Sequence, residues 1–149
     1  CNRSILYHCF DKKINKNLNK RLNRSEFMPF APVVTDKFAR KAFKNWKKNH
    51  KSSKFMTMTY HCTNFMKKNC PAIVHVDGTA RPQILYKKDN PLMYKILLSW
   101  YKKTNQIALL NTSFNHHEEP IVCTPEDAIK SFKRKNVDIL ILDNFVVSK

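Results

Sequence analysis

Apolar residues recur at helical spacing in the first third of the chain. Ile14, Leu18 and Leu22 follow Asp11 at intervals of four residues, which predicts a helix that buries one narrow stripe. A second helix is expected over residues 36–48, because its apolar residues recur every four positions while its lysines fall on the other side. Both helices should therefore pack on a core with a polar face outward.

Two further helix starts are marked by capping residues. Asn90 and Pro91 stand directly before a segment whose apolar residues recur at helical intervals, as at an N-terminus. Thr124 and Pro125 precede two acidic residues, which favour the positive end of the helix dipole. We expect a helix after each pair.

Strands are predicted where apolar and β-branched residues alternate or run together. The alternation in residues 54–61 is typical of a strand, and residues 71–86 indicate two more around a turn at Asp77 and Gly78. The continuous apolar run in residues 106–115 predicts a strand covered on both faces.

Two remaining apolar segments are expected to be extended. Residues 137–147 predict short buried strands broken at Asp143 and Asn144. Residues 27–34 contain two prolines, which should keep this partly buried segment out of a central position in a sheet.

Helices and strands alternate without a regular repeat, and no segment of biased composition separates them. We therefore predict one α/β domain over residues 1–149, of the mixed α+β kind. Its twisted mixed sheet should be covered by helices.

Charge and glycine content narrow the choice of ligand. Lys and Arg number 28 against 11 Asp and Glu, so the formal net charge of +17 favours phosphates or nucleic acid. Lys and Asn recur together along the chain, so many lysines could equally form a solvated surface. The single glycine, Gly78, excludes glycine-rich phosphate loops, and side chains must then hold any phosphate.

The cysteines show neither a CxxC pair nor a secreted disulfide pattern, which predicts reduced thiols in the cytoplasm. No apolar run approaches the ~20 residues of a membrane span, and no metal site is expected because zinc-like ligand spacing is missing. The chain begins at Cys1 without a methionine, so we expect a piece of a larger polypeptide.

Polar side chains able to bind an anion gather in three places. Ser113 and Asn115 share a face just past a buried strand, where open α/β sheets commonly bind ligands. The other two sets are a triad with the same alternation and a neighbouring pair: Asp77, Thr79 and Arg81, and Arg24 with Glu26. Each set taken alone is also compatible with a turn held by side-chain bonds or with a surface ion pair.

Several longer motifs together resemble a known family. "CNRSIL", "NRSEFMPFAPVV", "HVDGTARPQ", "NTSFN", "EEPIVCTPEDAI" and "DILILDNFVV" occur in the order and spacing of the C-terminal domain of the NodU/CmcH-type O-carbamoyltransferases. The resemblance runs from Cys1 to about Val147 and implies a YrdC-like (Sua5-like) fold.

The resemblance implies an enzymatic function. In this family the YrdC-like domain makes carbamoyl-adenylate from ATP and carbamoyl phosphate, with Mg²⁺ accompanying the ATP. A separate N-terminal Kae1-like domain, which the chain lacks, transfers the carbamoyl group to a hydroxyl acceptor, and it would act here in cis or in trans.

The resemblance also implies roles for particular residues. Four would be catalytic: Arg24, Arg81, Ser113 and Asn115. Six would bind the nucleotide: Arg3, Ser4, Asp77, Thr79, Asn111 and Thr112. The lysine of the family's Lys-x-Arg motif falls at Leu22, which cannot contact phosphate.

Two other functions stay open. The chain could be a non-catalytic basic module that binds RNA, or an inactive fragment of a transferase. Leu22 favours these alternatives, whereas the enzyme is favoured by a cluster of polar and basic residues: Ser113, Asn115, Arg24, Arg81 and Arg3.

Overall fold

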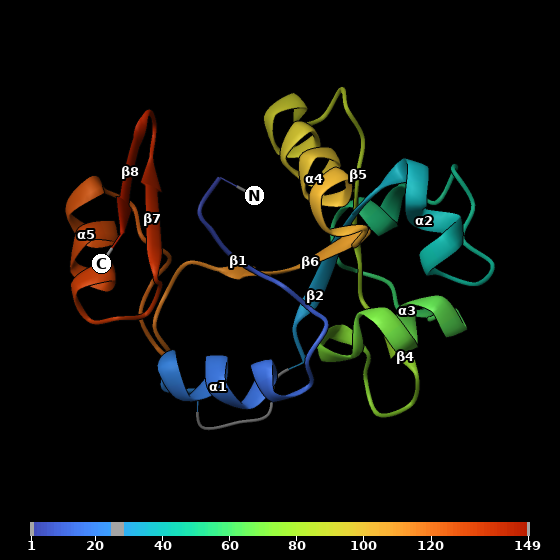
Figure 1. The fold of residues 1–149 in the computed structure, drawn as a ribbon, viewed down its shortest axis with the longest axis horizontal. Coiled ribbons are helices and arrows are strands. Elements are labelled where there is room, and N and C mark those ends of the chain that lie inside the picture. The colour runs from blue at the N-terminus through green and yellow to red at the C-terminus, as the bar shows by residue number, and fades with distance from the viewer. Residues whose placement is uncertain (1, 25–28, 149) are drawn as a thin grey trace.

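A computed structural model describes residues 2–24 and 29–148 (Figure 1). The strands are β1 (Ser4–Tyr7), β2 (Ala31–Thr35), β3 (Tyr60–His61), β4 (Thr79–Ala80), β5 (Gln83–Leu85), β6 (Ala108–Ser113), β7 (Ile139–Leu142) and β8 (Phe145–Ser148). The helices are α1 (Lys13–Arg21), α2 (Asp36–Ala42), α3 (Asn64–Asn69), α4 (Pro91–Thr104) and α5 (Pro125–Lys133), with 3-10 turns η1 (Lys51–Lys54) and η2 (Pro71–Ile73).

The main sheet has the strand order β1-β6-β2-β5. β6 runs antiparallel to β1 and β2, whereas β2 and β5 are parallel, so the predicted mixed sheet is confirmed. Adjacent residues of β6 belong to different cores: Leu110 packs with α1, while Leu109 packs with α4. Because successive strand residues face opposite ways, β6 is buried on both faces, as its apolar run predicts.

The helix starts that the sequence marks are confirmed. The Asn90 side chain accepts a hydrogen bond from the Met93 amide at the start of α4. Thr124 and Asp127 form a capping box at the start of α5, in which the side chain of each residue accepts a hydrogen bond from the backbone amide of the other. α4 is 14 residues long, and none of the helices in the described ranges is both long and apolar enough to span a membrane.

The expectation that prolines exclude residues 27–34 from a central strand is wrong. β2 lies between β6 and β5, and Pro32 within it is fully buried. Pro32 pairs with Leu110 of β6, but β5 pairs with β2 only from Val33 onward. The missing amide hydrogen of Pro32 is tolerated because the ladder beside it is incomplete. Residues 27 and 28 lie outside the described ranges.

Two other predicted elements are shorter than expected. The second helix ends at Ala42, because Phe43 is extended and forms a β-bridge with Cys62. Of the strand expected over residues 54–61, only Tyr60 and His61 are extended. Met56 instead adopts a left-handed φ of 56°, which interrupts the alternation on which the strand prediction rests.

Residues 71–86, which surround Gly78, differ from the prediction in the half before the glycine. Pro71 to Ile73 form a 3-10 turn in place of the expected strand, and the amide of Ala72 donates to the Cys9 carbonyl. The turn at Asp77 and Gly78 is confirmed, with Gly78 at a φ of +80° that suits glycine.

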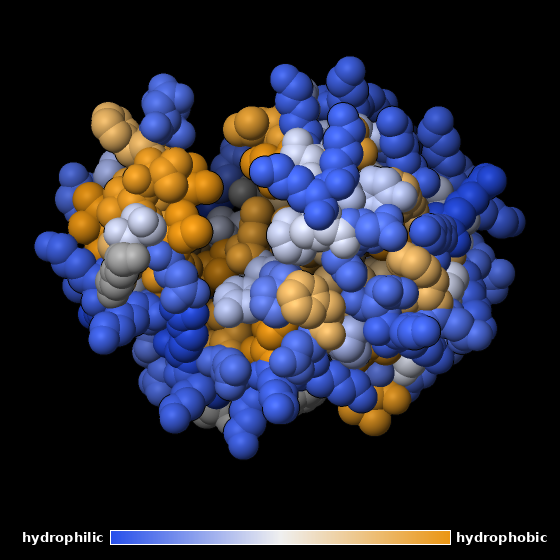
Figure 2. Space-filling model, in the orientation of Figure 1, coloured by the Kyte–Doolittle hydropathy of each residue, from blue (hydrophilic) through white to orange (hydrophobic). Residues whose placement is uncertain are grey.

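The C-terminal strands form a hairpin, broken at Asp143 and Asn144 as predicted, but they are mostly exposed. Phe145 is 73% exposed, and Ile141 and Val146 project from the hairpin's other face. Figure 2 shows this apolar patch over the part of the molecule that α5, β7 and β8 occupy in Figure 1. The apolar pattern predicted burial, yet most apolar side chains of the hairpin are exposed, and Leu140 is the buried one that packs in the core with residues of α5.

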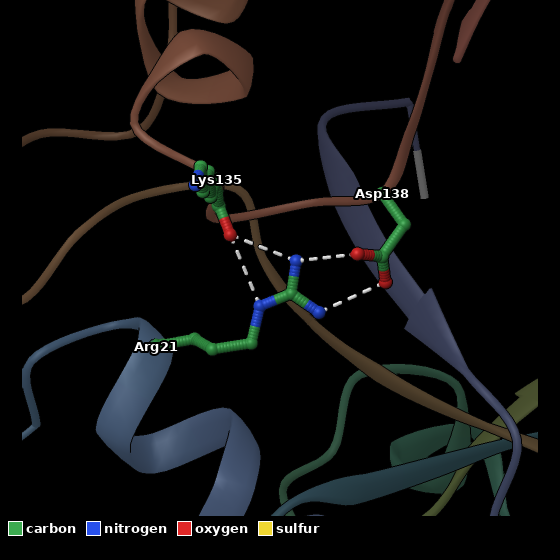
Figure 3. A network of polar contacts seen from close by, with 3 residues as sticks. All are labelled: Arg21, Lys135 and Asp138. Atoms are coloured by element: carbon green, nitrogen blue, oxygen red, sulfur yellow. Dashed lines mark hydrogen bonds and ion pairs between the residues drawn. The ribbon is translucent and has the colours of Figure 1, made fainter. Parts of the chain in front are cut away.

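Arg21 joins this C-terminal unit to the end of α1 (Figure 3). Arg21, at the end of α1, donates two hydrogen bonds to the Asp138 carboxylate at 2.8 and 2.9 Å. It also donates twice to the carbonyl of Lys135. The bidentate pair fixes the approach of α5 and β7 to α1, although its partial exposure limits its contribution to about 1 kcal/mol.

Leu110 and Leu92 provide a direct test of the two-faced core. Replacing fully buried Leu110 with alanine is expected to lower the free energy of unfolding by about 2–5 kcal/mol, because a cavity opens in β6. Leu92, 70% exposed on α4, is the matched control, and its alanine variant should stay within about 0.5 kcal/mol. Urea unfolding followed by circular dichroism measures both. Equal effects of the two substitutions would contradict this core.

Candidate functional site

The sheet brings the starts of three strands to the end of a fourth. Ser4 at the start of β1 pairs with Ser113 at the end of β6, and Ala31 at the start of β2 pairs with Asn111. Gln83 begins β5 on the far side of β2 and accepts a 2.8 Å hydrogen bond from the Asn111 amide. One end of the sheet therefore carries polar side chains from three strands, β1, β5 and β6, beside Ala31 of β2.

A cavity of about 500 Å³ opens at this end of the sheet. It is lined by all four residues predicted to be catalytic: Arg24, Arg81, Ser113 and Asn115. It is also lined by four of the predicted nucleotide contacts: Arg3, Ser4, Asn111 and Thr112. Segments distant in the sequence thus meet around one space that is large enough for a nucleotide. Glu26, considered as a partner of Arg24, lies outside the described residues.

Asp77 and Thr79 are placed differently and do not line this cavity. The Thr79 amide and hydroxyl both donate to one Asp77 carboxylate oxygen, at 2.9 and 2.7 Å. These hydrogen bonds stabilise the charged form and lower the pKa of the Asp77 carboxyl. The two residues stabilise the turn that precedes β4, two residues upstream of Arg81.

Arg24 is the most enclosed cation of the cavity. Its guanidinium donates to the Thr112 hydroxyl at 3.0 Å and lies 5.2 Å from the centre of the Phe30 ring. Burial lowers the pKa of Arg24, because desolvation disfavours its charge, but an arginine stays protonated at neutral pH. The hydroxyl and the ring hold the guanidinium in place without neutralising it.

The other two arginines are more exposed. Arg3 donates to the Val122 carbonyl at 3.3 Å, and Arg81 reaches the cavity from the segment between β4 and β5. Within the described ranges, Arg3, Arg24 and Arg81 form no ion pair, and no Asp or Glu lines the cavity. Three positive charges therefore face one space, which suits a polyanion such as a triphosphate.

Ser113 and Asn115 form a structured turn at the edge of the cavity. The Ser113 hydroxyl donates to the Asn115 side-chain oxygen at 2.5 Å. The Asn115 amide donates to the carbonyls of His116 and Glu119, each at 3.0 Å. The alternative of a turn held by side-chain bonds is therefore confirmed, and this turn also fixes the position of Ser113 at the cavity.

Contacts to two helices hold the same turn in place. The His117 amide donates to the Leu22 carbonyl at 2.9 Å, which joins the turn to the end of α1. Glu119 forms a 2.6 Å ion pair with Arg134 at the end of α5, which lowers the pKa of Glu119. The turn and Arg24 are thus both positioned by the segment that ends α1.

The position of Leu22 shows that it does not take the role of the lysine in the Lys-x-Arg motif. Its side chain is completely buried in the core and does not line the cavity. The neighbouring Lys20 and Arg21 line a separate hollow along α1. Among the described residues no lysine lines the cavity, so its positive charge comes from arginines.

Sequence reasoning missed several lining residues. Gln83 stands inside the motif "DGTARPQ" two residues after Arg81, so the alternation of side chains along an extended segment could have indicated it. Apart from Ala31 of β2, the apolar lining comes from loops whose sequence gave no sign of a shared position: Pro29, Phe30, Met56 and Ile121. Their convergence depends on chain paths that spacing does not reveal.

The chain matches a known protein family over its whole length. The family described as Carbamoyltransferase C-terminus matches residues 1–149. Nodulation protein NolO of Bradyrhizobium diazoefficiens is 34% identical over 99% of the chain, and a 3'-hydroxymethylcephem-O-carbamoyltransferase of Amycolatopsis lactamdurans is 26% identical over 95%. The chain spans 27% and 26% of the lengths of these two relatives.

A solved structure, full-length HypF in a phosphate- and nucleotide-bound form, is similar in shape. It aligns with a TM-score of 0.60 and 20% identity, over 88% of this chain and 16% of HypF. At this identity the likeness concerns the fold, and it confirms the YrdC-like mixed α/β fold expected from the sequence.

Restoring the lysine of the motif offers a test of the buried position. Leu22→Lys is expected to lower the free energy of unfolding by about 3 kcal/mol or more, because a charge enters the core without a partner. Pyrophosphate binding should not improve. The control is Lys20→Leu at an exposed position two residues earlier, which should change stability little. Urea unfolding and calorimetric titration with pyrophosphate measure these effects, and a stable variant with tighter binding would contradict the placement of Leu22.

Proposed function

Because the chain belongs to the family of carbamoyltransferase C-terminal domains, we propose that it makes carbamoyl-adenylate from ATP and carbamoyl phosphate. The membership confirms the resemblance to the NodU/CmcH type of O-carbamoyltransferase. The observation that carries the proposal is the cavity at the end of β6, where three arginines without ion pairs in the described structure meet polar groups of the sheet.

The proposed reaction has two steps. Carbamoyl phosphate first loses its phosphate to water, which leaves carbamate and inorganic phosphate. A carbamate oxygen then attacks the α-phosphorus of ATP, the bond to the β-phosphate oxygen breaks, and pyrophosphate leaves. The protein forms no covalent bond in either step, so its contribution is to position the reactants and to stabilise charge.

The arginines suit the second step, in which negative charge grows on the departing pyrophosphate. In the proposal Arg24, held by Thr112 and Phe30, is pre-organised for this charge, while the exposed Arg3 and Arg81 bind the outer phosphates. Ser113 stands at the end of β6 with a hydroxyl able to orient the carbamoyl group. Mg²⁺ would be held by phosphate oxygens and water, since no carboxylate of the described chain lines the cavity.

Transfer of the carbamoyl group needs a partner. We propose that a Kae1-like domain, in cis or in trans, receives carbamoyl-adenylate from residues 1–149 and passes the group to a hydroxyl acceptor. The proposal is supported by the relatives, of which this chain spans about a quarter. Contacts to the acceptor would then lie mostly outside this chain.

RNA binding without catalysis is the alternative that the net charge of +17 supports. The exposed lysines of α2 and the following loop face solvent away from the lining of the cavity: Lys37, Lys41, Lys44, Lys47 and Lys48. An RNA held by such a surface would depend steeply on salt, because binding releases counterions. An inactive fragment would bind neither ligand at a saturable site.

Replacing Arg81 distinguishes these functions. Arg81→Ala is expected to weaken ATP binding by about 10- to 100-fold, because one charge-assisted bond to phosphate is lost. Arg40→Ala is the matched control, since Arg40 is exposed on α2 and does not line the cavity. Calorimetric titration with ATP and with a structured RNA at two salt concentrations measures both ligands. RNA binding with a steep salt dependence and no saturable ATP site would favour the RNA-binding alternative.

Pyrophosphate release tests the chemistry itself. The chain is expected to release pyrophosphate from ATP when carbamoyl phosphate is present, and not when inorganic phosphate replaces it. Thin-layer chromatography of the products of ATP labelled at its γ-phosphate records the release, since inorganic phosphate from carbamoyl phosphate does not interfere with it. ATP binding without release, even with the Kae1-like domain of a relative added, would contradict the proposed reaction.

A further inference from the structure

Part of the lining of the cavity is apolar, and phosphates and a carbamoyl group do not account for it. Phe30 is buried beneath Arg24, but Met56 and Ile121 keep part of their side chains open to the cavity. Ile121 is 42% exposed. Isolated exposed apolar residues are common, yet these two come from segments 65 residues apart in sequence and line the same space as the arginines.

Met56 is held in an unusual backbone conformation. Its φ of 56° lies in the left-handed region, which a residue with a long side chain seldom adopts. Ser52 supports this turn, because its carbonyl accepts hydrogen bonds from the Phe55 amide and the Thr57 hydroxyl. These two hydrogen bonds maintain the backbone conformation that places Met56 at the cavity.

We propose that Met56 and Ile121 form the base-binding wall of the ATP site and make the cavity prefer a nucleotide to a bare polyphosphate. The inference rests on the proposed function, since it assumes that the arginines hold the phosphates. A ligand that contacts both the arginines and these two side chains must carry negative charge and an apolar part. A purine nucleotide has this form, and a thioether packs favourably on an aromatic ring.

The volume of the cavity agrees with this assignment. About 500 Å³ exceeds what a triphosphate alone needs and lies within the range of pockets that enclose nucleotide-sized ligands. The apolar residues would remove the base from water, and this burial adds affinity that phosphate contacts cannot supply. Met56 and Ile121 therefore determine specificity in this proposal and take no part in the chemistry.

Comparing ATP with inorganic triphosphate separates the two parts of the site. Met56→Gln, which keeps the length of the side chain, and Ile121→Thr, which keeps its branching at Cβ, are expected to weaken ATP binding by about 5- to 10-fold each. Triphosphate binding should stay within about 2-fold of the original chain, whereas Arg81→Ala should weaken both ligands. Calorimetric titration gives the affinities, and thermal unfolding establishes that each variant is folded.

Met58→Gln is the matched control, because Met58 is exposed on the same loop and does not line the cavity. Its sulfur accepts a hydrogen bond from the Ser52 hydroxyl, which the glutamine oxygen can replace. The control should bind ATP like the original chain. The proposal is overturned if the original chain binds ATP no more tightly than triphosphate, or if Met56→Gln weakens both ligands equally. Failure to bind either ligand would instead overturn the proposed function, and this inference with it.

Discussion

Uncompensated positive charge at the end of β6 is the constraint on which the site depends. Three guanidinium groups face one cavity, and within the described chain no carboxylate neutralises them. Such charges repel one another, so the fold must hold them from separate anchors. Arg24 is held by a hydroxyl and an aromatic ring, while Arg3 bonds to a backbone carbonyl. These neutral supports position the arginines and leave their charge available to an anion.

The same architecture replaces the glycine loops that many nucleotide-binding proteins use. With one glycine in the chain, backbone amides cannot easily approach a phosphate, and side chains from several segments take over. The turn after β6 shows how this is done. Asn115 uses its amide to bind two carbonyls of its own turn, and the His117 amide ties that turn to the end of α1. Precise placement here depends on polar contacts that are internal to the protein.

The C-terminal hairpin presents the opposite situation. Its apolar residues satisfy the sequence pattern of buried strands, but the described structure covers only part of one face. The pairing with Asp138 through Arg21 fixes where this unit stands without enclosing it (Figure 3). Local pattern and tertiary burial therefore agree for β6 and disagree for β7 and β8, because burial requires a neighbouring element that the pattern cannot supply.

Local chemistry allowed the sequence by itself to determine the capped starts of α4 and α5, the doubly buried β6 and the turn at Gly78. It also identified the family and eight residues that meet at the cavity. Only the tertiary structure decided that Pro32 occupies a central strand, that Leu22 is buried, and that Met56 and Ile121 share the cavity with the arginines. Caps and turns depend on neighbours within a few residues, which spacing records. Strand order, burial and the convergence of loops depend on contacts between distant segments, and the spacing of residues in the sequence does not record these contacts.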